Sequence, residues 1–233
     1  MKTAACSAAG RSREAGDGMI RLRYGNTNTY LLTGSGGSLL IDTDYAGTLP
    51  AFFREIKKQQ ILVEDITYLL ATHYHPDHMG LVRELMELGV GLLLVDVQLP
   101  FVHFSDPIFR REPRLGFRPV REQDAMVIRC SESRCFLQTL GISGEILHTP
   151  SHSEDSVSVV LDNGDCFVGD LEPMEYLAAY EDNGKLRADW ERITERRPKR
   201  IFYSHVNEKI LGQQSRNGGT EYGNLQTETG DPV

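Results

Sequence analysis

One nine-residue segment constrains this 233-residue chain more than any other feature. It places three of the seven histidines and one carboxylate within six residues, in the order Thr72-His73-Tyr74-His75-Pro76-Asp77-His78-Met79-Gly80. The apolar run 66–71 before it predicts a buried strand, and the apolar spacing of 79–88 after it predicts a helix. Imidazole nitrogens and carboxylate oxygens suit a borderline divalent ion such as zinc. The segment therefore predicts a metal site where a strand ends and a helix begins.

The remaining pattern predicts strands and helices in two blocks. Glycine-punctuated runs at 20–24, 29–32 and 38–42 are typical of a β-meander. Helical spacing covers 49–59 and 186–197, and short apolar runs predict further strands. These runs are 91–97, 126–129, 145–147, 156–161, 166–168 and 200–203. Strands that lead into helices in two blocks indicate an α/β fold with two sheets and helices outside.

Residues 98–124 interrupt this pattern. Prolines recur through the segment and exclude long regular elements, while phenylalanines alternate with charged residues. We interpret it as a lid inserted into one domain that covers 19–211. Residues 1–18 and 212–233 are polar and rich in small residues, and we expect both to be flexible tails.

Charge and composition exclude several classes of protein. The chain has 25 Lys and Arg against 33 Asp and Glu, a net charge of −8, which disfavours a general nucleic-acid binder. We find no apolar run of roughly 20 residues for a membrane span and no signal peptide, so we expect a cytoplasmic protein. Four cysteines are too few for a disulfide scaffold. Cys130 and Cys135 are interpreted as ordinary thiols, with a disulfide or a metal pair as the alternative.

The histidine cluster resembles a known motif. His73-x-His75-x-Asp77-His78 is similar to the HxHxDH signature of the metallo-β-lactamase-fold metallohydrolases. Three further motifs follow in that family's order: His152 ends a turn that resembles TPGH, Asp170 ends a strand that resembles Gly-Asp, and His205 follows the last strand. The resemblance implies a four-layer αββα sandwich with the lid as an insertion.

The resemblance also implies a ligand set. His73, His75 and His152 would hold one divalent ion, Asp77, His78 and His205 would hold a second, and Asp170 would bridge them. Zinc is the metal we expect, with iron and manganese as alternatives. A hydroxide that bridges the two ions would be the nucleophile, and Asp77 would also orient it as a catalytic residue.

Four residues depart from the family pattern, and two others lie close to the ligands. Ser151 and Asp44 stand where glycine is usual, and Ser204 and Val206 flank the last histidine, where glycines are also usual. Asp42 is either an anchor that hydrogen-bonds the ligand loop or a simple turn cap. His148 is expected to pack near the site rather than to bind metal.

The implied reaction is hydrolysis of an ester, thioester or lactone bond in a small molecule. A β-lactam or phosphodiester hydrolase, an iron-dependent enzyme similar to persulfide dioxygenases, and a non-catalytic binding module stay open as alternatives. We expect no nucleic-acid or membrane partner, and the oligomeric state stays open. A metal analysis with oxygen uptake separates the oxygenase from the hydrolase.

The lid carries arginines in a chain that is acidic overall. Arg110, Arg114 and Arg118 are candidates to clamp an anionic group of the substrate, because guanidinium presents a planar fork to carboxylate or phosphate. His103 and Phe104 are candidates for substrate contact, and Phe109 is the alternative apolar partner. The other interpretation is a solvated loop whose arginines pair with neighbouring acidic residues.

Overall fold

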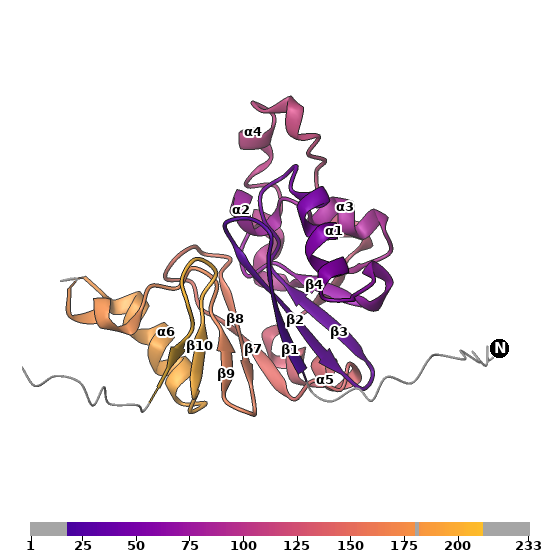
Figure 1. Ribbon diagram of the computed structural model, residues 1–233. Helices are drawn as coiled ribbons and strands as arrows, with labels where there is room; N and C mark the ends of the chain where they lie inside the picture. The colour runs from indigo at the N-terminus through magenta and orange to yellow at the C-terminus, as the bar shows by residue number, and fades with distance from the viewer. Residues whose placement is uncertain (1–17, 180–181, 212–233) are drawn as a thin grey trace, which may run out of the picture.

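The computed structural model describes residues 18–179 and 182–211 of the chain. Two β-sheets lie face to face in the middle, with helices on both outer sides (Figure 1). The strands are β1 Gly18–Arg23, β2 Asn28–Gly34, β3 Gly37–Ile41, β4 Tyr68–Leu70, β5 Gly91–Val95, β6 Met126–Ile128, β7 Gly144–His148, β8 Val157–Leu161, β9 Asp165–Phe167, β10 Arg200–Phe202 and β11 Lys209–Ile210. The α-helices are α1 Leu49–Lys58, α2 Pro76–Met79, α3 Val82–Glu87, α4 Asp106–Phe109, α5 Ser133–Thr139 and α6 Gly184–Thr194.

The first sheet has six strands in the order β1-β2-β3-β4-β5-β6. Strands β1, β2 and β3 pair antiparallel, as the predicted meander requires. From β3 onward the pairs are parallel, and Leu40 lies opposite Leu69 across β3 and β4. Parallel neighbours end at the same edge of a sheet, so the residues after β4 and β5 reach one edge together.

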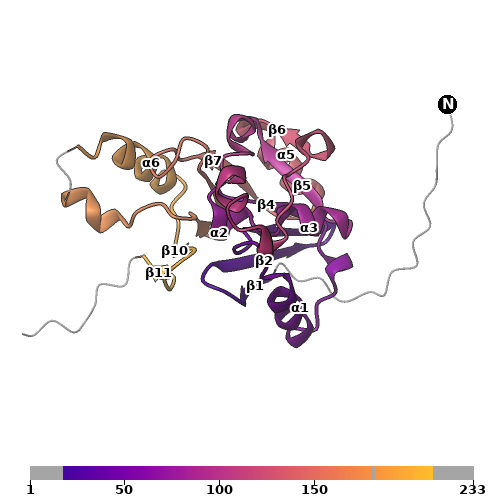
Figure 2. The same cartoon turned by 90° about the horizontal axis from the view of Figure 1, so that it is seen from above.

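The second sheet has five strands in the order β11-β10-β9-β8-β7. Strands β7, β8 and β9 pair antiparallel, while β9 and β10 are parallel with Arg200 opposite Asp165. The loops after β7, β9 and β10 consequently emerge at one edge of this sheet. Figure 2, which views the molecule from above, shows α6 on the outer side of this sheet and α1 on the far side of the other.

Three apolar layers hold the sandwich together, because successive strand residues point to opposite faces. In β2, Tyr30 and Leu32 face the second sheet, while Leu31 faces the layer under α1 and α3. In β8, Val159 faces the first sheet and Val160 faces α6. The fold is therefore the four-layer αββα sandwich predicted from the sequence.

The structure corrects one predicted helix. Residues 79–88 do not form a single helix, because α2 ends at Met79 and α3 begins at Val82. Leu81 between them has φ −104° and ψ 1°, outside helical values. A Cβ on Gly80 would lie 2.2 Å from the backbone nitrogen of Ala46, so the chain turns here against another backbone segment. The predicted helix 186–197 is α6, which begins two residues earlier and ends three residues earlier.

The segment 98–124 contains only short helical pieces, as its prolines require. These are α4 and the 3₁₀ turns Asp96–Phe101, Pro113–Leu115 and Glu122–Asp124, and α4 projects at the top of Figure 1. Phe109 is buried and stacks on Phe117 with ring centroids 4.0 Å apart. The predicted tails lie outside the described residues, apart from Gly18 in β1. Among the helices of 18–179 and 182–211, none is long and apolar enough to cross a bilayer.

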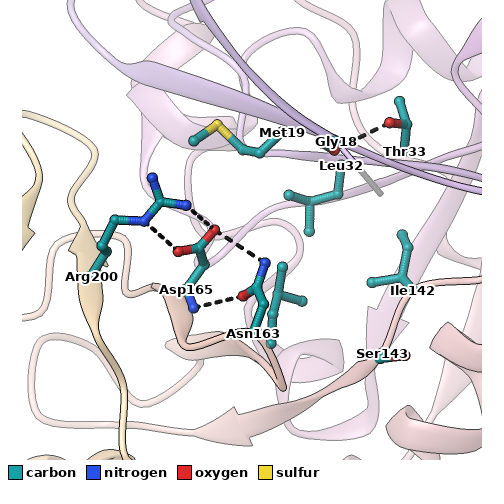
Figure 3. Close-up of a pocket in the computed structure, with 10 residues that line it drawn as sticks. Gly18, Met19, Leu32, Thr33, Ile142, Ser143, Asn163, Asp165 and Arg200 are labelled. Atoms are coloured by element: carbon teal, nitrogen blue, oxygen red, sulfur yellow. Dashed lines mark hydrogen bonds and ion pairs between the residues drawn. The ribbon is translucent and has the colours of Figure 1, made fainter. Parts of the chain in front are cut away.

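A pocket of about 230 Å³ opens between the sheets, at the end where β1 and β10 begin (Figure 3). Met19 and Leu32 form part of its apolar wall. Its polar side is a bidentate ion pair in which Arg200 Nε and Nη2 each lie 2.6 Å from a carboxylate oxygen of buried Asp165. The pair joins the first residues of β9 and β10. The predicted ligands all follow strand ends, so this pocket is separate from their site.

Candidate metal centre

The seven predicted ligands all lie just beyond the carboxyl ends of strands. His73 and His75 follow β4, and Asp77 and His78 lie in α2, which begins directly after His75. The second sheet supplies the other three, which are His152 after β7, Asp170 after β9 and His205 after β10. Strand ends project side chains toward the gap between the two sheets, which is why residues 132 positions apart in sequence can meet.

The first group consists of His73, His75 and His152, and one ring nitrogen of each lies within 4.8 Å of the others. Nδ1 of His75 is 3.0 Å from Nε2 of His73 and 3.2 Å from Nε2 of His152. His73 is fully buried, while His152 is exposed. The group is therefore accessible to solvent through His152 and the partly buried His75.

The second group consists of Asp77, His78 and His205, which meet the same 4.8 Å limit. His205 Nε2 lies 3.2 Å from Asp77 Oδ2, and His78 Nε2 lies 3.9 Å from Asp77 Oδ1. This group has one carboxylate where the first has only imidazoles. The two groups match the division that the resemblance implies.

Asp170 reaches both groups. Its Oδ2 lies 4.0 Å from His73 Nε2, 3.8 Å from His152 Nε2 and 3.3 Å from His78 Nε2. Its Oδ1 lies 3.3 Å from His205 Nε2. The carboxylate is thus placed between the groups, where a bridging ligand would stand.

The protonation of the cluster follows from burial and from its carboxylates. Burial lowers the pKa of His73 and of His152. Burial would also lower the pKa of His78, but the carboxylates of Asp42 and Asp170 outweigh it and raise that pKa to about 10. Hydrogen bonds to Asp170 and Asp77 raise the pKa of His205 to about 10. Without a metal, His78 and His205 therefore hold protons more readily than His73 and His152 do.

The Asp170 carboxyl stays ionised despite burial. Burial alone would raise its pKa, but the adjacent imidazoles of His205 and His78 hold it well below its usual range. The pKa of Asp77 is also lowered, chiefly by its hydrogen bond with His205. Both carboxylates are therefore charged at neutral pH and able to bind cations.

The donor set fits a pair of divalent ions. Nε2 of His78 is buried and makes no hydrogen bond to any residue of the described ranges, although Asp170 lies nearby. Buried polar atoms are normally paired, so an unpaired ring nitrogen that faces two carboxylates is the arrangement a cation would complete. Five imidazoles and two carboxylates also form a nitrogen and oxygen donor set typical of zinc and related ions.

Asp42 anchors the ligand loop, which decides between the two interpretations of this residue. Its Oδ1 accepts the Thr72 backbone N–H at 2.6 Å. Its Oδ2 lies 3.0 Å from each of Thr72 Oγ1, His78 Nδ1 and Ser204 Oγ. A carboxylate can only accept, so Nδ1 of His78 carries the hydrogen and leaves Nε2 for the cluster. Asp42 also has a left-handed backbone, with φ 61°.

The four departures from the family pattern differ in what they contribute: the side chains of Asp44 and Ser204 form hydrogen bonds, whereas the buried Oγ of Ser151 has no partner among the described residues. Ser151 has no left-handed backbone, and Ser204 donates to Asp42. Asp44 is buried and accepts the backbone N–H groups of Thr27 at 3.0 Å and Tyr45 at 2.6 Å. Val206 is exposed, and its carbonyl accepts a hydrogen bond from Asn28.

The proposed substrate residues separate into one near the cluster and others farther along the lid. The Phe104 ring lies 5.6 Å from the His75 ring, and 56% of its side chain is exposed. His103 has Nδ1 3.0 Å from Asp106 and Nε2 3.2 Å from Glu122, so both ring nitrogens are engaged within the lid. Phe109 is buried in the apolar layer under α1 and α3, where its ring packs 5.0 Å from that of Tyr45, so it offers no exposed face.

The lid arginines are all exposed. Arg118 forms an ion pair with Glu87 at the end of α3, and Arg121 pairs with Asp124 at 2.9 Å. These contacts fit the interpretation of a solvated loop for that half of the lid. Arg110 and Arg114 lie nearer to α4, and their role in substrate binding stays a prediction.

Three other predicted positions lie outside the two ligand groups. His148 Nε2 contacts the carbonyl of Glu154 at 2.8 Å, which agrees with a packing role near the site. Cys130 and Cys135 are free thiols.

Several residues that hold the ligand loops were not identified from the sequence. Asp155 accepts hydrogen bonds from the loops of His73 and His152, and buried Gln98 donates to the Ala71 carbonyl at 2.8 Å. On α6, Asp189 accepts the Ser151 N–H at 2.8 Å. No local motif marks these residues, because each has a backbone partner that only the fold brings near.

Fold and site together define an αββα sandwich with a histidine and aspartate cluster at the strand ends. A model of the metallo-beta-lactamase superfamily matches residues 22–205, and the chain belongs to this superfamily. It is 29% identical over 183 residues to the beta-lactamase-like protein 2 homolog of Drosophila melanogaster, covering 78% of this chain and 59% of that protein.

Two further comparisons extend this result. The chain is 25% identical over 186 residues to a protein of Claviceps purpurea named atrochrysone carboxyl ACP thioesterase, covering 79% of this chain and 52% of that protein. It thus spans little more than half the length of these relatives. The crystal structure of a metallo-beta-lactamase family protein from Thermus thermophilus superposes with a TM-score of 0.62 at 19% identity, covering 82% of this chain and 74% of that one. That likeness establishes the fold alone.

Proposed function

We propose that this protein is a hydrolase that holds two divalent metal ions and cleaves a thioester, or a related ester or lactone, in a small molecule. The observation that carries the proposal is the pair of three-residue groups with Asp170 between them. The thioesterase name of the Claviceps purpurea relative supports the thioester among these bonds. Zinc is the metal proposed for both positions.

When bound, the two ions would supply Lewis acidity and an activated water near neutral pH. The chain's own residues would hold and orient the reactants. Asp77 is half-buried, and its ionised carboxylate would accept a hydrogen bond from the attacking water and orient it. Because His205 holds Asp77 at 3.2 Å, that orientation depends on both residues.

The lid would supply the substrate contacts. Phe104 presents an exposed ring beside His75, where the apolar part of an acyl group could pack. Arg110 and Arg114 are exposed cations that could bind a carboxylate or phosphate on the substrate. We therefore propose an acyl substrate with an anionic group, and no nucleic acid, given the net charge of −8.

The test is a substrate panel run with zinc-, manganese- and iron-loaded protein. The panel contains chromogenic thioesters, esters, lactones, nitrocefin and phosphodiesters. We expect the highest kcat/KM on a thioester with zinc, and its loss both in His152→Ala and after removal of metal by a chelator.

Two outcomes would overturn the proposal in different ways. Oxygen uptake with a persulfide in the iron-loaded protein, without hydrolysis of any substrate, would make it an oxygenase. Metal binding without turnover of any substrate would make it a binding module. A second variant, Phe104→Ala, should raise KM for long acyl chains more than for short ones if the ring contacts the acyl group.

A further inference from the structure

A buried carboxylate outside the ligand set lies between the two loops that carry the first group. Asp155 is 3% exposed. Its Oδ2 accepts the backbone N–H of Tyr74 at 2.6 Å, and its Oδ1 accepts the hydroxyl of Ser153 at 2.8 Å. Tyr74 stands between His73 and His75, and Ser153 follows His152 directly. One side chain therefore touches residues adjacent to all three ligands of this group.

Tyr74, whose N–H Asp155 accepts, is also held through its carbonyl group. The carbonyl of Tyr74 accepts the hydroxyl of Ser105, which is fully buried, at 2.6 Å. The carbonyl of Thr72 accepts the backbone N–H of Val157 at 2.8 Å, which ties the same loop to β8. Asp155 is the member of this frame that reaches both ligand loops through its side chain.

The three imidazoles lie so close together that a small shift of either ligand loop would change their spacing. His75 Nδ1 lies 3.0 Å from His73 Nε2 and 3.2 Å from His152 Nε2, although His152 belongs to the other sheet. Metal–nitrogen bonds near 2.0–2.1 Å tolerate little displacement of a ligand. A charge-assisted hydrogen bond to a backbone N–H is among the stronger and shorter ones, so it can fix the loop closely.

The second group is held by other residues. Thr27 Oγ1 donates to the Asp77 carbonyl at 2.7 Å, and His205 Nδ1 lies 3.3 Å from the Asn26 carbonyl. Buried Asp44 accepts the N–H of Thr27. Asp44 thus resembles Asp155 in burial and in accepting backbone N–H groups, but its partners adjoin the second group.

We propose that Asp155 is a positioning residue that sets the spacing of His73, His75 and His152, and so governs metal affinity in the first group without affecting the second. The inference rests on the proposed function, because it requires the cluster to bind metal. Loss of a residue that orients metal ligands typically weakens metal binding about 10- to 100-fold.

The experiment measures Zn²⁺ affinity in full-length protein by competition with a chromophoric chelator, in two backgrounds. His205→Ala removes a ligand of the second group, and His152→Ala removes a ligand of the first. Asp155→Ala should weaken the remaining Zn²⁺ site about 10- to 100-fold in the His205→Ala background. It should change affinity less than about 3-fold in the His152→Ala background, where the first group is already broken.

Two variants serve as controls. Asp44→Ala should not reproduce the loss in the His205→Ala background. Asp155→Asn keeps the shape and one acceptor for the Tyr74 N–H, so it should restore most of the affinity that Asp155→Ala loses. Thermal unfolding of each metal-free variant shows that the fold is retained. If Asp155→Ala does not fold, Ser153→Ala carries the test, because it removes the link between Asp155 and the loop of His152 and otherwise only the contact between Ser153 Oγ and Ser156 Oγ.

The outcomes separate this inference from the proposed function. Equal effects of Asp155→Ala in both backgrounds, or no effect in the His205→Ala background, would overturn the positioning role while metal binding stands. An equal loss of Zn²⁺ affinity from Asp44→Ala in the His205→Ala background would show that the effect of Asp155→Ala is general destabilisation. If the unmodified protein binds no Zn²⁺, the proposed function fails first.

Discussion

Replacing Asp42 by alanine tests whether its hydrogen bonds hold the metal-binding loop. The change leaves four groups without their acceptor: the Thr72 N–H and hydroxyl, His78 Nδ1 and the Ser204 hydroxyl. Hydroxyls can rotate toward other acceptors, and Thr72 Oγ1 already lies 3.2 Å from His73 Nδ1. The Thr72 N–H and the His78 ring cannot turn away, so these two carry most of the cost.

The expected loss follows from those two groups. A buried donor without an acceptor costs about 1–3 kcal/mol, which gives about 2–6 kcal/mol for the pair. Alanine at φ 61° adds about 1 kcal/mol, because it lacks the short polar side chain that makes aspartate tolerant of the left-handed region. We expect Asp42→Ala to lower the free energy of unfolding by about 3–7 kcal/mol, measured by urea denaturation of metal-free protein.

Asp42→Asn separates stability from metal binding. Asparagine tolerates the left-handed backbone and fills the same space, so we expect a loss below about 2 kcal/mol. The asparagine amide has one acceptor oxygen in place of the two of aspartate. In one orientation its NH₂ group faces the Thr72 N–H, and in the other it faces His78 Nδ1. When it faces His78, the ring proton must move to Nε2, the atom that faces Asp170. Zn²⁺ affinity should then fall about 10- to 100-fold.

Two results would refute this reasoning. An Asp42→Ala protein whose free energy of unfolding lies within about 1 kcal/mol of the unmodified protein would show that the four bonds do not hold the loop. An Asp42→Asn protein that binds Zn²⁺ with unchanged affinity would show that the tautomer of His78 does not depend on Asp42. Ser204→Ala removes only one hydroxyl donor and should cost far less than Asp42→Ala.

Three further predictions concern the cluster and the lid. Asp170→Ala should abolish most turnover and one or both metals, and near-normal activity with two metals per chain would contradict a bridging role. The pKa values of His78 and His205 are raised to about 10 without metal, so metal binding must release their two protons. The metal affinity of the second group should therefore fall by up to about 100-fold per pH unit below 10. A chelator titration whose result does not change with pH would contradict this. Arg118 is paired with Glu87, so Arg118→Ala should leave the KM values of matched anionic and neutral esters unchanged from those of the unmodified protein. Arg110→Ala should raise KM for the anionic ester alone if Arg110 clamps the substrate.

The sequence alone determined the fold class and the metal-binding pattern. Strand-to-helix alternation in two blocks predicted two sheets with helices outside, and the three apolar layers confirm it. The spacing His73-x-His75-x-Asp77-His78 identified four ligand candidates, because one tight turn after a strand can bring all four together. Periodicity failed at 79–88, since helical spacing cannot reveal that Ala46 of another segment approaches Gly80.

Only the tertiary structure decided how the cluster is held and which lid residues lie beside it. Asp42, Asp155 and Gln98 act on backbone groups far away in sequence, and such partners leave no local motif. The lid arginines could not be distinguished from the sequence, yet the structure pairs Arg118 with Glu87 of α3. Among the proposed substrate residues, Phe104 is the one whose ring lies beside the ring of a predicted ligand, His75. A ligand's chemistry follows from its residue type, but its orientation depends on long-range hydrogen bonds that exist only once both sheets have packed.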